Sequence, residues 1–116
     1  MTSLPKQIRI TNQTQLQSLF DSGKSFSSGG ITLKYVQSQT EFKVGFSAPK
    51  RLHPTAVTRN LLKRRMRESF RLQQNLLGES FLGVGYFIYN NKEVKSSQDI
   101  YRAFTTLLTN WKGCDT

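Results

Sequence analysis

The stretch GFSAPKRLHPTAVTRNLLKRRMRESFR, residues 45–71, decides the fold of this chain. It starts at the end of an alternating apolar segment and passes through a linker that contains Pro49 and Pro54. From about Thr55 to Gln74 the sequence then has no glycine or proline. Proline suits the first turn of a helix, where its missing N–H costs nothing. The stretch therefore predicts a strand, a short linker and a long helix, in that order.

On a helical wheel at about 100° per residue, the long helix divides into a charged face and an apolar face. The charged face holds Arg59, Asn60, Lys63, Arg64, Arg67 and Arg71. The apolar face holds Val57, Leu61, Leu62, Met66, Phe70 and Leu72, and Arg65 falls among them. We expect the stem of Arg65 to lie on the core edge with its guanidinium in water. Cations four residues apart repel one another, and only Glu68 can relieve them here, so this face predicts a polyanionic partner.

The charge of the chain is concentrated in the same stretch. Seventeen Lys and Arg against seven Asp and Glu give the 116 residues a net charge of +10. The 22 residues from Lys50 to Arg71 contain eight bases and one acid, and therefore supply +7 of that total. Phosphate contacts of arginine and lysine release counterions, and the planar fork of arginine binds phosphate through two hydrogen bonds. The concentration favours a nucleic-acid partner over a charged face that only keeps the protein in solution.

Length and composition bound the class of protein. The length fits one domain over residues 1–116. No apolar run of about 18 residues could span a membrane, and Met1–Arg9 lacks the apolar segment of a signal peptide. The single cysteine, Cys114, suits a reducing compartment. We expect a cytoplasmic protein with no membrane partner.

Alternating and helical patterns predict the elements around the central stretch. Before the central stretch they predict a flexible basic arm over 1–11, a helix over 12–22, and a turn or short edge strand near 24–28. Strands over 31–35 and 42–46 follow, joined by a hairpin loop at 37–40. After the central stretch come a strand over 84–89 and a helix over 97–111, whose inward stripe is Ile100, Phe104, Leu107, Leu108 and Trp111. The segment VGYFIY, residues 84–89, is apolar on both faces, which is typical of a central strand. The order predicts an α+β fold, a single-domain α-β sandwich with helices packed on a sheet of about four strands.

The central stretch resembles the signature of the bacterial ribonuclease P protein family. That signature has a helix of the pattern R-N-x-x-K-R-x-x-R-E after a strand that ends G-[LF]-x-[VA]-x-K-[KR]. The helix pattern is matched in register by Arg59, Asn60, Lys63, Arg64, Arg67 and Glu68, and the strand end by Gly45, Lys50 and Arg51. The chain departs from the family at Leu61, where a basic residue is frequent, and has Arg65 instead.

The resemblance implies that the long helix makes a left-handed crossover between parallel strands. It also implies a protein subunit of an endoribonuclease, whose RNA subunit with bound Mg²⁺ hydrolyses the phosphodiester at the 5′ end of mature tRNA. The expected partners are ribonuclease P RNA, bound by the basic helix, and precursor tRNA, with no obligate protein partner. The single-stranded 5′ leader would lie in a cleft beside the sheet, for which the candidates are Phe20, Lys34, Tyr35, Ser47, Lys50, Arg51 and one face of strand 84–89. Alternation alone does not say whether Lys34 or Tyr35 faces this cleft.

The polypeptide itself is expected to hold no catalytic or metal-binding residue. A nuclease needs a carboxylate cluster for metals or a histidine paired with an acid, and the seven acids here are scattered. The lone His53, in a proline-flanked loop, is expected at the surface. Two other classes compete with this hypothesis: a ribosomal or other structural RNA-binding protein, and a DNA-binding or anionic-membrane protein. A membrane helix would leave its apolar face exposed, whereas the sheet needs that face here.

Overall fold

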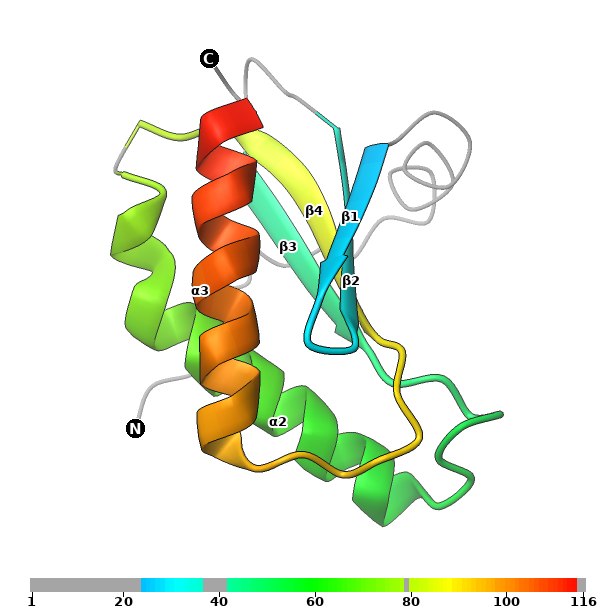
Figure 1. Cartoon of the computed structure of the whole chain (residues 1–116). Helices are drawn as coiled ribbons and strands as arrows, with labels where there is room; N and C mark the ends of the chain where they lie inside the picture. Colours follow the sequence, from blue (N-terminus) through cyan, green and yellow to red (C-terminus); the bar gives the residue numbers. More distant parts are fainter. Residues whose placement is uncertain (1–23, 37–41, 79, 115–116) are drawn as a thin grey trace.

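The computed structural model describes residues 24–36, 42–78 and 80–114 of the chain (Figure 1). In chain order the elements are β1 (Lys24–Ser28), β2 (Ile31–Val36), β3 (Phe42–Ser47), α2 (Ala56–Gln73), the 3-10 turn η2 (Gln74–Leu76), β4 (Gly83–Tyr89) and α3 (Ser97–Cys114). Of the two possibilities near residues 24–28, the structure has the strand. The arm over 1–11, the helix over 12–22 and the loop at 37–40 lie outside the described residues.

The four strands form one mixed sheet in the order β1-β2-β4-β3. Antiparallel pairs join β1 to β2 and β2 to β4, whereas β3 and β4 are parallel. The prediction that residues 84–89 form a central strand is confirmed, because β4 has a neighbour on each side. The prediction of a hairpin between β2 and β3 is wrong, because β4 lies between them. A strand that is apolar on both faces gains most burial in the middle of the sheet, and there it separates two strands that are consecutive in the sequence.

The connection from β3 through α2 to β4 is a left-handed crossover, as the resemblance implies. Figure 1 shows β3 and β4 running downward behind the helices, with β4 to the right of β3. About 98% of such connections between parallel strands are right-handed, so this one could not follow from general rules of topology. Both helices cover the same face of the sheet (Figure 1).

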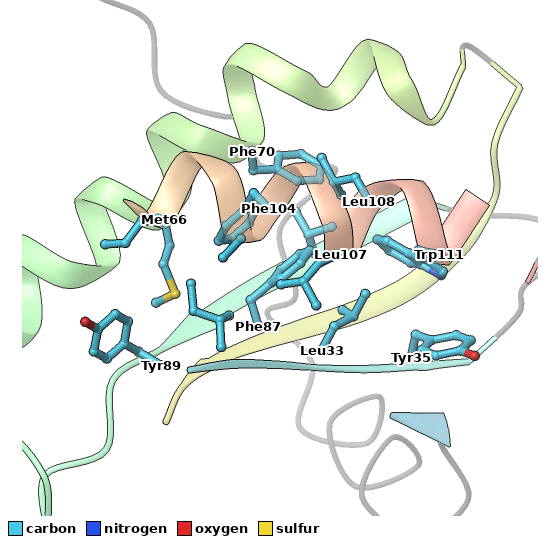
Figure 2. Close-up of a cluster of buried hydrophobic side chains, with 14 of the residues drawn as sticks. Leu33, Tyr35, Met66, Phe70, Phe87, Tyr89, Phe104, Leu107, Leu108 and Trp111 are labelled. Carbon is cyan, nitrogen blue, oxygen red and sulfur yellow. The ribbon is translucent and has the colours of Figure 1, made fainter. Parts of the chain in front are cut away.

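The core lies between that face and the two helices. Alternate residues of β2 and β4 point into it, among them Leu33 and Phe87, and α2 adds Met66 and Phe70 (Figure 2). The rings of Phe87 and Phe104 stack with centroids 4.6 Å apart. The predicted inward stripe of the last helix is confirmed, since all five of its residues are buried.

The apolar face of α2 is narrower than the helical wheel predicts. Leu62, Met66 and Phe70 are buried, in agreement with the prediction. Val57 in the first turn is 80% exposed and Leu72 in the last turn is 54% exposed. The buried residues of α2 are Leu62, Met66, Ser69, Phe70 and Gln73, so Val57 and Leu72 lie outside the stripe that packs against the core.

Candidate nucleic-acid interface

The charged face of α2 lies on the surface over most of its length. Asn60, Arg64 and Arg67 are exposed, whereas Arg59, Lys63 and Arg71 are half-buried. The first turn of the helix contains no acidic residue. The helix therefore presents mainly positive charge to the solvent, as the sequence predicts.

Two arginines of the charged face make an ion pair or hydrogen bonds with other residues of the protein. Arg71 makes an ion pair with Glu68 one turn earlier. Nη1 of Arg59 donates hydrogen bonds to the carbonyl oxygens of His53, at 3.0 Å, and Pro54, at 2.8 Å. In the part of the chain that the structure describes, Arg64 and Arg67 make no hydrogen bond or ion pair. Among the arginines of the motif, these two are the ones without a hydrogen-bond or ion-pair partner in the described residues.

Arg65 is half-buried, and its guanidinium has a partner within the protein. Its Nη1 donates a hydrogen bond to the carbonyl oxygen of Lys95, at 2.6 Å. The arginine that interrupts the apolar pattern of α2 therefore joins the helix to the loop before α3. A hydrogen bond with a charged donor is stronger than one between neutral groups, so this contact helps to hold the loop against α2.

His53 is buried, so the expectation that it lies at the surface is wrong. Its side chain is 4% exposed, and its Nε2–H donates to the carbonyl oxygen of Asn91 at 2.6 Å. The imidazole also contacts the ring of Tyr89, with centroids 5.6 Å apart. Sequence reasoning missed this role because the partner carbonyl is 38 residues away in the chain.

The face of the sheet turned away from the helices gathers polar and aromatic side chains. Strand pairing aligns Lys34 of β2 with Tyr86 of β4, and Tyr86 with Gly45 of β3. Ser47 pairs with Ile88, two residues after Tyr86, and therefore shares this face. Lys34, Tyr86 and Ser47 are half-buried. We call this face, which neither α2 nor α3 covers (Figure 1), the open face of the sheet.

Tyr35 does not belong to the open face. It pairs with Gly85 and points to the helices, where its ring is 7% exposed. Its centroid lies 5.2 Å from that of Phe26 and 6.3 Å from that of Trp111. Of the two alternatives left open by the sequence, the structure thus places Lys34 on the open face and Tyr35 in the core.

The remaining candidates for the cleft lie near one end of the sheet or outside the described residues. Lys50 and Arg51 are exposed in the turn that follows β3. Phe20 lies outside the described residues. The sequence includes Tyr86 among the candidates only as part of one face of the strand 84–89, since a strand that is apolar on both sides gives no signal for choosing a face. The pairing of Tyr86 with Lys34 shows that both side chains point to the same, open face of the sheet.

The described residues contain no group of three or more His, Cys, Asp or Glu that could hold a metal ion. Within the same residues, neither helix is long and apolar enough to cross a membrane. The structure thus offers an arginine-rich helix face and a mixed polar and aromatic sheet face. These features define a small basic α+β domain built on a left-handed βαβ unit.

Comparison with known proteins places this domain in a family. A family model described as Ribonuclease P matches residues 4–112. The chain therefore belongs to the ribonuclease P protein family. It is 33% identical over 72 residues to the ribonuclease P protein component of Nitrosococcus oceani, a match that covers 61% of this chain and 60% of that protein. It is 30% identical over 94 residues to the component of Streptococcus pneumoniae strain Hungary19A-6, covering 80% and 73% of the two chains.

Solved structures support the same fold. The chain superposes on the Staphylococcus aureus RNase P protein with a TM-score of 0.77 and 22% identity, covering 92% of this chain and 97% of that one. For the RNase P protein from Thermotoga maritima the TM-score is 0.76 at 18% identity, with coverage of 88% and 96%. At these identities the likeness shows the fold alone.

Proposed function

We propose that this protein is the protein subunit of ribonuclease P, which works in the cytoplasm. In this role it assists the RNA-catalysed, endonucleolytic removal of the 5′ leader from precursor tRNA. The observation that carries the proposal is the match of the family's helix motif to a solvent-facing row of cations on α2. Asn60, Arg64 and Arg67 of that motif are exposed, and no acidic residue lies in the first turn of the helix.

The basic helix is the proposed docking surface for ribonuclease P RNA. Its candidate contacts are Arg59, Asn60, Lys63, Arg64, Arg67 and Arg71. Neutralising phosphates with such residues releases condensed counterions, so affinity should fall as salt rises. Because α2 is packed on the core through Leu62, Met66 and Phe70, its charged face is held rigid before the RNA binds.

The open face of the sheet is the proposed site of the single-stranded leader. A leader site that tolerates different sequences needs an aromatic platform and nearby cations, because every base has a π-face and every phosphate a charge. Tyr86 supplies the ring and Lys34 the adjacent cation on the paired strand. Ser47, Lys50 and Arg51 extend this surface past the end of β3, and Phe20 remains a candidate. Tyr35 is not included, because its ring is in the core.

In this proposal the chemistry belongs to the RNA subunit with its bound Mg²⁺. The protein contributes the positive charge of the basic helix and a platform for the leader on the open face, and it holds these two surfaces at a fixed distance from each other. Electrostatic positioning of this kind can lower the salt or metal concentration at which cleavage occurs, since the protein replaces cations that would otherwise screen the phosphates.

Reconstitution with ribonuclease P RNA tests the proposal. The protein should lower the Mg²⁺ concentration that the RNA needs to cleave precursor tRNA. The result against it would be an unchanged Mg²⁺ requirement at protein concentrations that saturate binding. A second candidate, a ribosomal or other structural RNA-binding protein, shares the charge of α2. Recovery of ribosomal RNA instead of ribonuclease P RNA with the tagged protein would favour that candidate.

A further inference from the structure

Arg59 opens the basic motif, yet its guanidinium points back onto the protein. Through Nη1 it holds the carbonyl oxygens of His53 and Pro54, at 3.0 and 2.8 Å. Hydrogen bonds from a charged donor are stronger than those between neutral groups. Both carbonyls belong to residues 49–54, the segment before α2, which we call the basic turn. Arg59 therefore ties the basic turn to the first turn of the helix.

The basic turn carries two exposed cations in a closed backbone loop. The backbone N–H groups of Leu52 and His53 both bond to the carbonyl oxygen of Pro49, at 3.2 and 3.1 Å. Lys50 and Arg51 lie between the ends of this loop and are exposed. Because the loop directly follows β3, their position relative to the open face depends on how firmly the loop is held.

A second anchor holds the basic turn from the other side. The imidazole of His53 is buried between the carbonyl oxygen of Asn91 and the ring of Tyr89. The backbone of His53 is thus held by Arg59 and its side chain by the loop that follows β4. The C-terminal end of the basic turn is fixed from two directions.

We propose that Arg59 is a positioning residue for the leader of precursor tRNA. It acts by fixing the basic turn, so that Lys50 and Arg51 are held directly after β3, the strand that carries Ser47 of the open face. This inference rests on the proposed function and assigns to Arg59 a task different from that of its neighbours in the motif. A turn that is already ordered loses less backbone entropy when the leader binds, and the leader is therefore held more tightly.

The structure offers Arg64 as a matched control on the same helix face. Arg64 is exposed and, among the described residues, makes no hydrogen bond or ion pair. Its contribution should come from its own charge against the RNA subunit. Replacing either arginine removes one positive charge from α2, but only the loss of Arg59 releases the basic turn.

The experiment measures two affinities of the reconstituted holoenzyme. The first is the affinity of the protein for ribonuclease P RNA. The second, at saturating protein, is the affinity of the assembled enzyme for precursor tRNA with a leader and for mature tRNA. The single variants are Arg59→Ala, Arg59→Gln, Arg64→Ala, Arg64→Gln and Lys50→Ala. Two double variants combine Lys50→Ala with Arg59→Ala or with Arg64→Ala. Thermal unfolding is recorded for each.

We expect Arg59→Ala to weaken binding of the leader-containing substrate about tenfold, because the released turn must be ordered when the leader binds, and to leave mature tRNA unaffected. In the Lys50→Ala background the same change should cost less than about threefold, because the turn then has less charge to position. Arg59→Gln should recover part of the loss, since its amide can still donate to one carbonyl. It also serves if the alanine variant does not fold. Arg64→Ala and Arg64→Gln should weaken assembly equally and leave both substrate affinities unchanged.

Three results would overturn the inference. Arg59→Ala could behave like Arg64→Ala and weaken assembly alone. The loss of affinity for the leader-containing substrate in the double variant could equal the product of the losses caused by Arg59→Ala and Lys50→Ala alone. Arg59→Gln could lose as much affinity for that substrate as Arg59→Ala does. The proposed function fails separately, and the inference with it, if Lys50→Ala changes no substrate affinity and Arg64→Ala does not change assembly.

Discussion

The indole ring of Trp111 lies directly against the backbone of Gly85. A Cβ atom on Gly85 would come within 2.5 Å of Cη2 of Trp111 and within 3.0 Å of two further ring atoms. Trp111 is 2% exposed and also meets the edge of the Phe81 ring, with centroids 5.0 Å apart. This contact brings the C-terminal half of α3 against the middle of the sheet, and the absence of a side chain at Gly85 permits it.

Gly85→Ala should therefore destabilise the protein by about 1–3 kcal/mol, the usual cost of overpacking a closed core. Denaturant unfolding measures the change. Gly113→Ala is the matched control, because no atom of the described residues lies within 4 Å of a Cβ at that position and alanine favours a helix. Equal stability of the two variants would show that α3 can move away from β4 without cost.

The hydroxyl of Tyr89 holds the loop between β4 and α3. It donates to the carbonyl oxygen of Glu93 at 2.5 Å and accepts from the backbone N–H of Lys95 at 3.0 Å. Tyr89→Phe should cost about 1–3 kcal/mol at neutral pH, because the Lys95 N–H and the Glu93 carbonyl lose this partner. Urea unfolding of the two proteins measures the difference.

Burial raises the pKa of Tyr89 above its ordinary value near 10. The unfolded chain therefore loses this proton at lower pH than the folded protein does. The stability that the hydroxyl contributes is fully present below about pH 10 and is lost as the pH rises toward the folded pKa. The gap in stability between wild type and Tyr89→Phe should narrow in that alkaline range. A gap that widens there would contradict the assignment.

Replacing Lys63, Arg64 and Arg67 together with alanine should weaken assembly with ribonuclease P RNA without unfolding the protein. Alanine is a good helix former and all three side chains lie on the solvent-facing side of α2. The slope of log K against log salt should flatten by roughly two to three units, as expected for three lost phosphate contacts. A slope identical to that of the wild type would mean that this face does not meet the RNA.

Tyr86→Ala should reduce affinity of the holoenzyme for precursor tRNA with a leader of several nucleotides by about 1–3 kcal/mol, the value of one stacking platform. Affinity for mature tRNA should not change, since it has no leader. Tyr35→Ala is the informative comparison, because Tyr35 lies in the core on the opposite face. It should lower the melting temperature and affect both substrates alike. The leader assignment fails if Tyr86→Ala gives this second pattern.

The protein without RNA should not cleave precursor tRNA. The expectation comes from the scattered acids of the sequence and from the proposal that the RNA subunit carries the chemistry. Highly purified protein, treated with nuclease and then freed of it, should be inactive at any Mg²⁺ concentration. Cleavage that survives this treatment would require a catalytic site on the polypeptide.

Much of the local structure was predictable from the sequence. The long helix, the central strand over 84–89 and the inward stripe of the last helix all follow from residue periodicity, because one face of each must avoid water. The concentration of charge between Lys50 and Arg71 likewise pointed to the basic surface. The motif of the family added the left-handed crossover, which periodicity does not contain.

The sequence alone determined which residues are helical, which are extended and where the charge lies, since these depend on neighbours within one or two turns. The tertiary structure alone decided that β4 separates β2 from β3, that Tyr35 and not Lys34 joins the core, and that His53 is buried. It also decided that Arg59 and Arg65 bond to carbonyl oxygens of loops. Every residue has a backbone carbonyl, so the sequence does not predict which carbonyl oxygen will accept a hydrogen bond from a given arginine. That choice is made by which distant segments the packed core brings together.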